Sequence, residues 1–161
     1  MTDVSTLLER FRASSELLAE ATTGIASDEA DFRPAAGAWC IRQVVCHLAD
    51  AEAVAVMRLR QVLAEDNPVL PAFDGTVWAE KLDYAKCDIA QPLETFRRLR
   101  AENYQLLKDQ PEEAFRRTGA HTESGVMTLH DLIKSNAEHV EEHVHEIRRA
   151  RAAYFHRSGP S

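Results

Sequence analysis

Apolar residues recur at three- and four-residue steps in four stretches of this chain, and that periodicity restricts the possible fold more than any other feature. The chain shows no sustained alternation of apolar and polar residues of the kind typical of a β-strand. Four amphipathic helices of this length bury their apolar faces best against one another. The sequence therefore predicts an all-α four-helix bundle, with helices over Leu7–Ile25, Ile41–Val62, Ile89–Leu106 and Thr128–Tyr154.

The connections between the helices predict their relative directions. Pro34 and Gly37 interrupt the chain between the first helix and the second. A much longer link, from about Glu65 to Asp88, joins the second helix to the third, and a short helix is expected near Trp78. Because such a link can carry the chain from one end of the bundle to the other, helices two and three would run parallel. Helices two and four would then run antiparallel.

Length and composition narrow the class of protein. The 161 residues suit one domain, expected over 1–157 with a frayed tail at 158–161. The net charge of -7 and the lack of a long basic run argue against nucleic acid as a partner. No window approaches the ~20 apolar residues of a membrane span, and the charged N-terminus argues against a signal peptide. Three cysteines cannot all pair, so reduced thiols and a cytoplasmic location are expected.

Two histidines on the last predicted helix are candidates for binding a metal ion. His139 and His143 are four residues apart, which places both imidazoles on one face of the helix about one turn apart. They lie on the same side as Asn136 and Ile147, toward the interior of the bundle. Buried polar groups without partners cost about 1–3 kcal/mol each, so this strip must be hydrogen-bonded or bound to metal.

A third ligand would have to come from another helix, and His47 is the best candidate. It lies at the edge of the buried face of the second helix, at a height that matches His139 and His143 in an antiparallel partner. His121 falls in a predicted loop, and His145 is expected to face solvent. From spacing alone, two interpretations stay open: a three-histidine metal site, or ordinary core and surface histidines.

Two segments resemble the DinB/YfiT-like family of metal-dependent hydrolases. They are PAAGAWCIRQVVCHLADAE at 34–52 and HTESGVMTLHDLIKSNAEHVEEHVHEI at 121–147, the second with an HxExGxxTL lead-in and a closing His-x-x-x-His. Carried over, the three metal histidines of the family fall on His47, His139 and His143. The resemblance also implies an up-down-down-up bundle and frequent homodimers. Cys40 departs from the family pattern, in which serine or threonine commonly follows the tryptophan.

Three neutral imidazoles leave at least one coordination position open, which is typical of a catalytic site. All-nitrogen ligation suits zinc or nickel. We therefore expect a metal-dependent enzyme that acts on a small molecule with a metal-bound water or a low-molecular-weight thiol as nucleophile. The resemblance offers hydrolysis and thiol S-transfer as reaction types. The alternative is a non-catalytic metal-binding module for stress response or sensing, and a sealed site would favour it.

Two carboxylates near His47 have separate expected roles. Asp50 lies one turn from His47, so it could orient that imidazole or act as a catalytic base, or it could be a simple surface or helix-pairing aspartate. Glu52 falls on the apolar stripe but points away from His47. We expect it to pair with an arginine, either Arg42 or one from another helix.

Three further polar or aromatic residues could surround the site. Asn136 lies one turn before His139 and could hydrogen-bond to a metal-binding imidazole. Trp78 and Tyr84 lie on the long connection, where they could line a pocket or pin the connection to the core.

Overall fold

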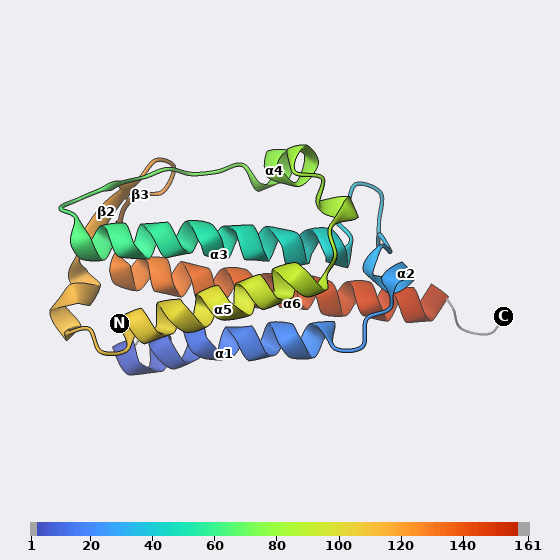
Figure 1. The fold of residues 1–161 in the computed structure, drawn as a ribbon, viewed down its shortest axis with the longest axis horizontal. Helices are drawn as coiled ribbons and strands as arrows, with labels where there is room; N and C mark the ends of the chain where they lie inside the picture. The colour runs from blue at the N-terminus through green and yellow to red at the C-terminus, as the bar shows by residue number, and fades with distance from the viewer. Residues whose placement is uncertain (1–2, 158–161) are drawn as a thin grey trace.

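Four long helices form the body of the molecule in this computed structural model, which describes residues 3–157 (Figure 1). The first and last helices run in one direction and the middle two in the other, so the order is up-down-down-up. This arrangement confirms the four-helix bundle, the parallel middle helices and the long crossover between them. The helices are α1 (Val4–Thr22), α3 (Ile41–Ala64), α5 (Ala90–Leu107) and α6 (Leu129–Arg157). The tail predicted at 158–161 lies outside the described residues.

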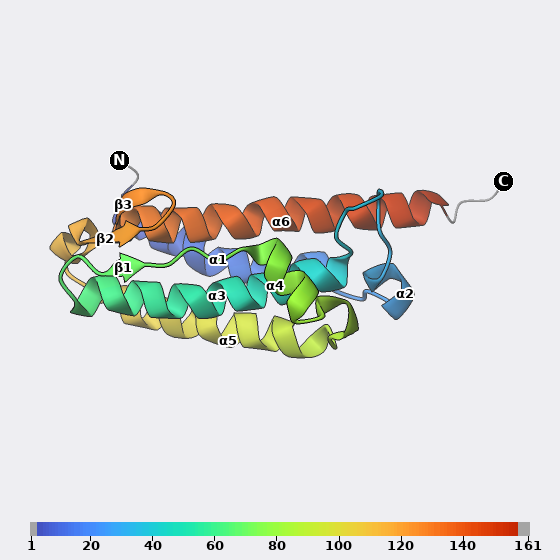
Figure 2. The same ribbon diagram turned by 90° about the horizontal axis from the view of Figure 1, so that it is seen from above.

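Short elements fill the connections. A single turn, α2 (Ser27–Ala30), precedes α3, and the link between α3 and α5 contains α4 (Gly75–Lys81) and η1 (Tyr84–Lys86). α4 is the short helix predicted near Trp78. The link runs back along α3, and α4 packs against that helix (Figure 1 and Figure 2). The last connection begins with η2 (Glu112–Arg116).

A small three-stranded sheet is present that the periodicity does not predict. β1 (Val69–Leu70) pairs in parallel with β2 (Thr118–His121), and β2 pairs antiparallel with β3 (Gly125–Thr128). Strands of two to four residues are too short to show an alternating pattern. The sheet matters for the site because it ties the start of the long connection to the hairpin that leads into α6.

Side chains at the helix starts explain where the helices begin. Thr128 and Asp131 form a reciprocal capping pair at the start of α6, a pairing that their three-residue spacing favours: the Asp131 carboxylate accepts from the Thr128 backbone N–H, and Thr128 Oγ1 accepts from the Asp131 backbone N–H. At α3, where Cys40 replaces the expected hydroxyl residue, Gln43 Oε1 accepts from the Cys40 backbone N–H at 3.2 Å. Asp74 accepts from two backbone N–H groups at the start of α4.

The buried polar centre of the bundle joins three helices. Glu52 on α3 and Arg100 on α5 are 1% and 2% exposed, and Arg100 Nη2 donates to Glu52 Oε2 at 2.6 Å. Asn103 donates to the other Glu52 oxygen at 2.8 Å, and Ser14 on α1 accepts from Arg100 at 2.8 Å. The predicted arginine partner of Glu52 therefore comes from another helix, whereas Arg42 pairs with Asp31.

The polar centre changes the predicted face of α5. The periodicity predicts that Leu99 and Leu106 face the core, but both are only partly buried. The helix instead turns Arg100 and Asn103 inward, between buried Phe96 and Leu107. The guanidinium of Arg100 lies 4.0 Å from the Phe11 ring centroid, so its planar faces contact aromatic carbon while its edge forms hydrogen bonds.

The two larger of three apolar clusters lie on either side of this centre. One cluster lies toward the sheet and the other toward the start of α3. Within residues 3–157, none of the helices combines the length and the apolar character that crossing a bilayer requires.

Removing one partner of the buried ion pair should destabilise the fold strongly. Glu52→Leu leaves the Arg100 charge buried without its carboxylate, which should lower the free energy of unfolding by about 3–5 kcal/mol. The double variant Glu52→Leu/Arg100→Met should recover most of that loss because no buried charge remains. Urea unfolding of the metal-free protein measures both. A loss below about 1 kcal/mol in the single variant would show that the pair is not the polar centre of the fold.

Candidate metal centre

Three imidazoles from two helices meet inside the bundle. His47 lies on α3, and His139 and His143 lie one turn apart on α6. His139 Nε2 is 3.0 Å from His47 Nε2 and 3.1 Å from His143 Nε2. One ligand nitrogen from each residue lies within 4.8 Å of the other two. The antiparallel packing of α3 against α6 thus brings together the three histidines that the sequence singles out.

The nitrogen positions fit a single metal ion better than hydrogen bonding alone. Each imidazole nitrogen carries either one proton or one lone pair, so His139 Nε2 can form only one ordinary two-centre hydrogen bond with its two neighbours. Zinc bound tetrahedrally by imidazoles, with Zn–N distances near 2.0–2.1 Å, places its nitrogens roughly 3.3 Å apart. The observed separations of 3.0 and 3.1 Å are close to this value. The donor set therefore suits a divalent ion of the zinc type.

Burial keeps the His47 and His139 imidazoles in the form that binds metal. It lowers the pKa of His47 to about 4, with the nearby His143 adding to the effect. The pKa of His139 falls to about 3, again mainly through burial, with further lowering by the charges of His143, His47 and Arg100. A neutral imidazole has the lone pair that a metal requires. At neutral pH both rings are therefore ready to act as ligands.

Surrounding residues hold the rings in place. Glu146 Oε2 lies 2.8 Å from His143 Nδ1, which fixes the orientation of that ring and leaves Nε2 to face the other histidines. The rings of Trp39 and Phe73 contact the His47 ring, at centroid distances of 5.1 and 6.1 Å. Gly75, the first residue of α4, lies so close that a Cβ there would be 2.8 Å from His47 Cε1. The α4 backbone therefore packs directly on the His47 imidazole.

The other residues predicted near the site have different contacts. The Tyr84 hydroxyl donates to Asp50, and no hydrogen bond joins Asp50 to any of the three histidines within residues 3–157. Asn136 Nδ2 donates to the carbonyl of Leu132 in its own helix. Trp78 packs on Phe73 at a centroid distance of 4.7 Å and so supports the wall beside His47. Tyr84 is buried against α3 and holds the connection to the core.

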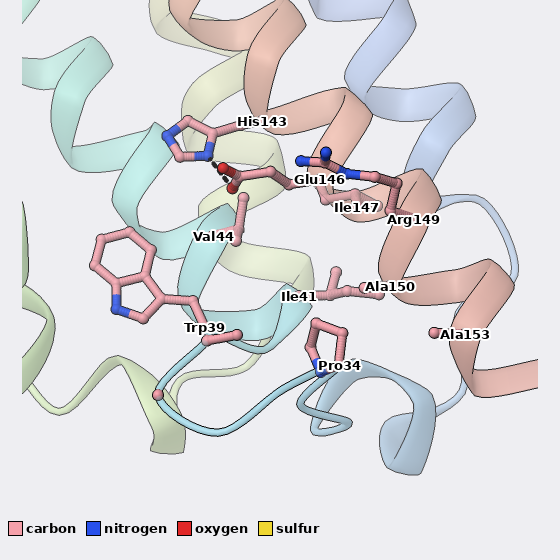
Figure 3. Close-up of a pocket in the computed structure, with 12 residues that line it drawn as sticks. Pro34, Trp39, Ile41, Val44, His143, Glu146, Ile147, Arg149, Ala150 and Ala153 are labelled. Carbon is pink, nitrogen blue, oxygen red and sulfur yellow. Dashed lines mark hydrogen bonds and ion pairs between the residues drawn. The ribbon is translucent and has the colours of Figure 1, made fainter. Parts of the chain in front are cut away.

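Two cavities of different character reach the histidines. A cavity of about 660 Å³ is bordered by His143, Glu146 and the apolar side chains around Trp39 (Figure 3). A second, of about 380 Å³, is bordered by His47 and His139 and has a more polar lining. Besides these two histidines, its polar lining comes from six residues, of which only the last was predicted to lie beside the site: Arg58, His121, Glu123, Ser124, Ser135 and Asn136.

Two of these residues carried weak sequence signals. His121 is the last residue of β2 rather than part of a loop, and strand pairing turns it toward the site. Arg58 lies eleven residues after His47, about three turns along the same helix face, a spacing that could have pointed to it. His145, as predicted, is exposed.

Comparison with known proteins supports the fold and the family. A family model described as the DinB superfamily matches residues 10–147. A protein of Oceanobacillus iheyensis, named provisionally as a metal-dependent hydrolase, is 32% identical over 131 residues, covering 81% of this chain and 76% of its own. A second protein of that organism with the same kind of name is 26% identical over 154 residues, covering 91% and 84%.

A solved structure has the same architecture. YfiT from Bacillus subtilis, described as a probable metal-dependent hydrolase with an unusual four-helix bundle topology, superimposes with a TM-score of 0.85. The match covers 93% of this chain and 89% of YfiT at 22% identity, so it bears on the fold alone. With a family model spanning most of its length and a relative above 30% identity, this chain belongs to the DinB superfamily.

Proposed function

We propose that this protein is an enzyme that uses one divalent metal ion, held by His47, His139 and His143, to act on a small molecule. The observation that carries the proposal is the convergence of three Nε2 atoms from two helices at separations suited to one ion. The names of relatives as metal-dependent hydrolases agree with it. Zinc and nickel are the ions that best suit three imidazole ligands.

The residues around the histidines support catalysis rather than a purely structural or sensing role. A divalent ion held by three imidazoles keeps a position for a fourth ligand and lowers the pKa of water or of a thiol bound there. Glu146 fixes the His143 ring, while Trp39 and Phe73 shield the His47 side from water. The cavities on either side give a substrate access, which a sealed structural site would not need.

Hydrolysis and thiol transfer are the two candidate reactions, and the cavities favour thiol transfer. Hydrolysis needs space for one organic substrate, whereas transfer of a low-molecular-weight thiol to an electrophile needs space for two. The largely apolar cavity at His143 and the polar cavity at His47 could hold an electrophile and a polar thiol, respectively. Asp50, bound to Tyr84, would then act at most through its effect on α3 and the connection.

Removing one histidine should abolish both metal binding and activity. His143→Ala should reduce bound zinc or nickel from about one ion per chain to well below that, because only two imidazoles remain. The control His145→Ala removes an exposed histidine two residues away and should retain the ion. Elemental analysis measures the metal, and assays with an activated ester and with a thiol plus an aryl halide measure the two reactions. Equal metal content in both variants would contradict the proposal.

Adding a methyl group at Gly75 should disturb the centre without touching a ligand. In Gly75→Ala the new Cβ would lie 2.8 Å from His47 Cε1, so the ring or the start of α4 must move. We expect metal affinity to fall about tenfold or more, as when other groups that orient a ligand are altered. Thr76→Ala, at the next and exposed position, serves as the control. A competition titration with a chelator gives both affinities, and unchanged affinity in Gly75→Ala would count against His47 as a ligand.

A further inference from the structure

Arg58 is a cation at the polar cavity whose hydrogen-bonding capacity is only partly used. Its Nη2 donates to the carbonyl of Pro71, at the start of the long connection. Its Nε is buried and has no hydrogen-bond partner. Within residues 3–157, no carboxylate lies within ion-pair distance of its guanidinium. Buried donors are nearly always bonded, so the unpaired Nε marks Arg58 as a guanidinium with unused hydrogen-bonding capacity at this cavity.

The electrostatic surroundings of Arg58 favour an anionic acceptor. Burial lowers the pKa of Arg58, which shows that the charge is held partly away from water. The carboxylate of Glu123 opposes that effect from a distance, but Glu123 is exposed at the rim. An arginine stays charged under these conditions, and a guanidinium binds carboxylate or phosphate groups with two parallel hydrogen bonds. An anionic group inside the cavity would therefore stabilise the desolvated Arg58 charge most.

His121 supplies a second donor at the same cavity. Its Nδ1 accepts from the backbone N–H groups of Glu123 and Ser124, at 3.3 and 3.2 Å. Burial, and then the charge of Arg58, lower the pKa of His121, so its ring is neutral at neutral pH. A neutral imidazole that accepts at Nδ1 carries its proton on Nε2. The hairpin between β2 and β3 thus fixes His121 as a donor.

Helix α3 connects this donor pair to the metal centre. His47 and Arg58 are eleven residues apart, which separates their Cα atoms by about 16 Å along the helix and only about 20° around it. Helical side chains lean toward the helix N-terminus, so the Arg58 side chain leans toward His47. Between them lies Ala51, whose small side chain also lines the cavity. One small molecule in this cavity can therefore contact both His47 and Arg58.

We propose that Arg58 and His121 form an anion-binding subsite, so that the substrate of the metal centre carries a carboxylate or phosphate group. Only the link to the reaction rests on the proposed function, because the subsite itself needs no metal ion. Arg58 would bind the anionic group, His121 would donate from Nε2, and the reacting end of the substrate would lie at the histidines. The subsite thereby selects the substrate by charge and by length.

Binding of simple anions to the full chain tests the subsite. Inorganic phosphate and propionate serve as the phosphate and carboxylate probes, and each is titrated into zinc-loaded and metal-free protein. Calorimetry gives the affinity, and the NMR signal of the Arg58 Nε–H group reports contact at the residue itself. We expect at least one probe to bind both forms and to shift that signal downfield as Nε gains an acceptor.

Three variants test whether anion binding depends on Arg58. Arg58→Gln should weaken anion binding at least tenfold. Arg58→Lys should retain part of the affinity, because lysine keeps the positive charge but lacks the planar set of guanidinium N–H donors. Arg98→Gln, an equal charge change on the exposed face of α5, should leave the affinity unchanged. Thermal unfolding checks that each variant is folded.

The outcomes separate this inference from the proposed function. Binding that depends on Arg58 in protein that takes up no zinc would support the subsite and contradict the metal centre. Equal affinity in wild type and Arg58→Gln, or no binding of either probe to either form, would overturn the subsite. Binding confined to the zinc-loaded form and insensitive to Arg58→Gln would assign the anion to the metal and would also overturn it.

Discussion

The candidate site depends on three imidazoles that meet at one point between two antiparallel helices. Because His47 comes from α3 while His139 and His143 come from α6, a shift of either helix by one turn would separate the nitrogens by about 5 Å. Burial keeps the His47 and His139 rings uncharged, which leaves their lone pairs for a metal. The opposite directions of α3 and α6, with the long crossover between α3 and α5, bring these side chains together.

A second polar network also fixes how far α3 is displaced along the bundle axis, through contacts with α5 and α1 rather than with α6. Glu52 is one and a half turns beyond His47 on α3, and its bonds to Arg100 and Asn103 tie α3 to α5, while Ser14 ties in α1. The Arg100 charge also contributes to the lowered pKa of His139, so the two networks are electrostatically connected. Apolar packing alone would tolerate sliding of the helices, whereas paired buried polar groups lose their partners if the helices slide.

The helices, and the position of His139 and His143 on one helix face, were predictable from the sequence because they depend on local periodicity and on spacing within a helix. Adding His47 to them required the antiparallel direction of two helices and the family resemblance. The reciprocal cap at Thr128 and Asp131 was likewise predictable from local spacing. The face of α5 was not, since Arg100 is buried only because Glu52 from a distant segment meets it. Gly75 and His121 were missed because close backbone approach and two-residue strand pairing leave no periodic signal. Site residues on the long connection, such as Gly75, can be identified only from the tertiary structure.

X-ray absorption at the zinc or nickel edge of metal-loaded wild-type protein tests the central claim most directly. Three imidazole ligands at about 2.0–2.1 Å and no sulfur ligand are expected, since within the described residues no cysteine belongs to the group formed by His47, His139 and His143. A spectrum with fewer than three imidazoles, or with a sulfur at about 2.3 Å, would show that the histidines do not share one ion.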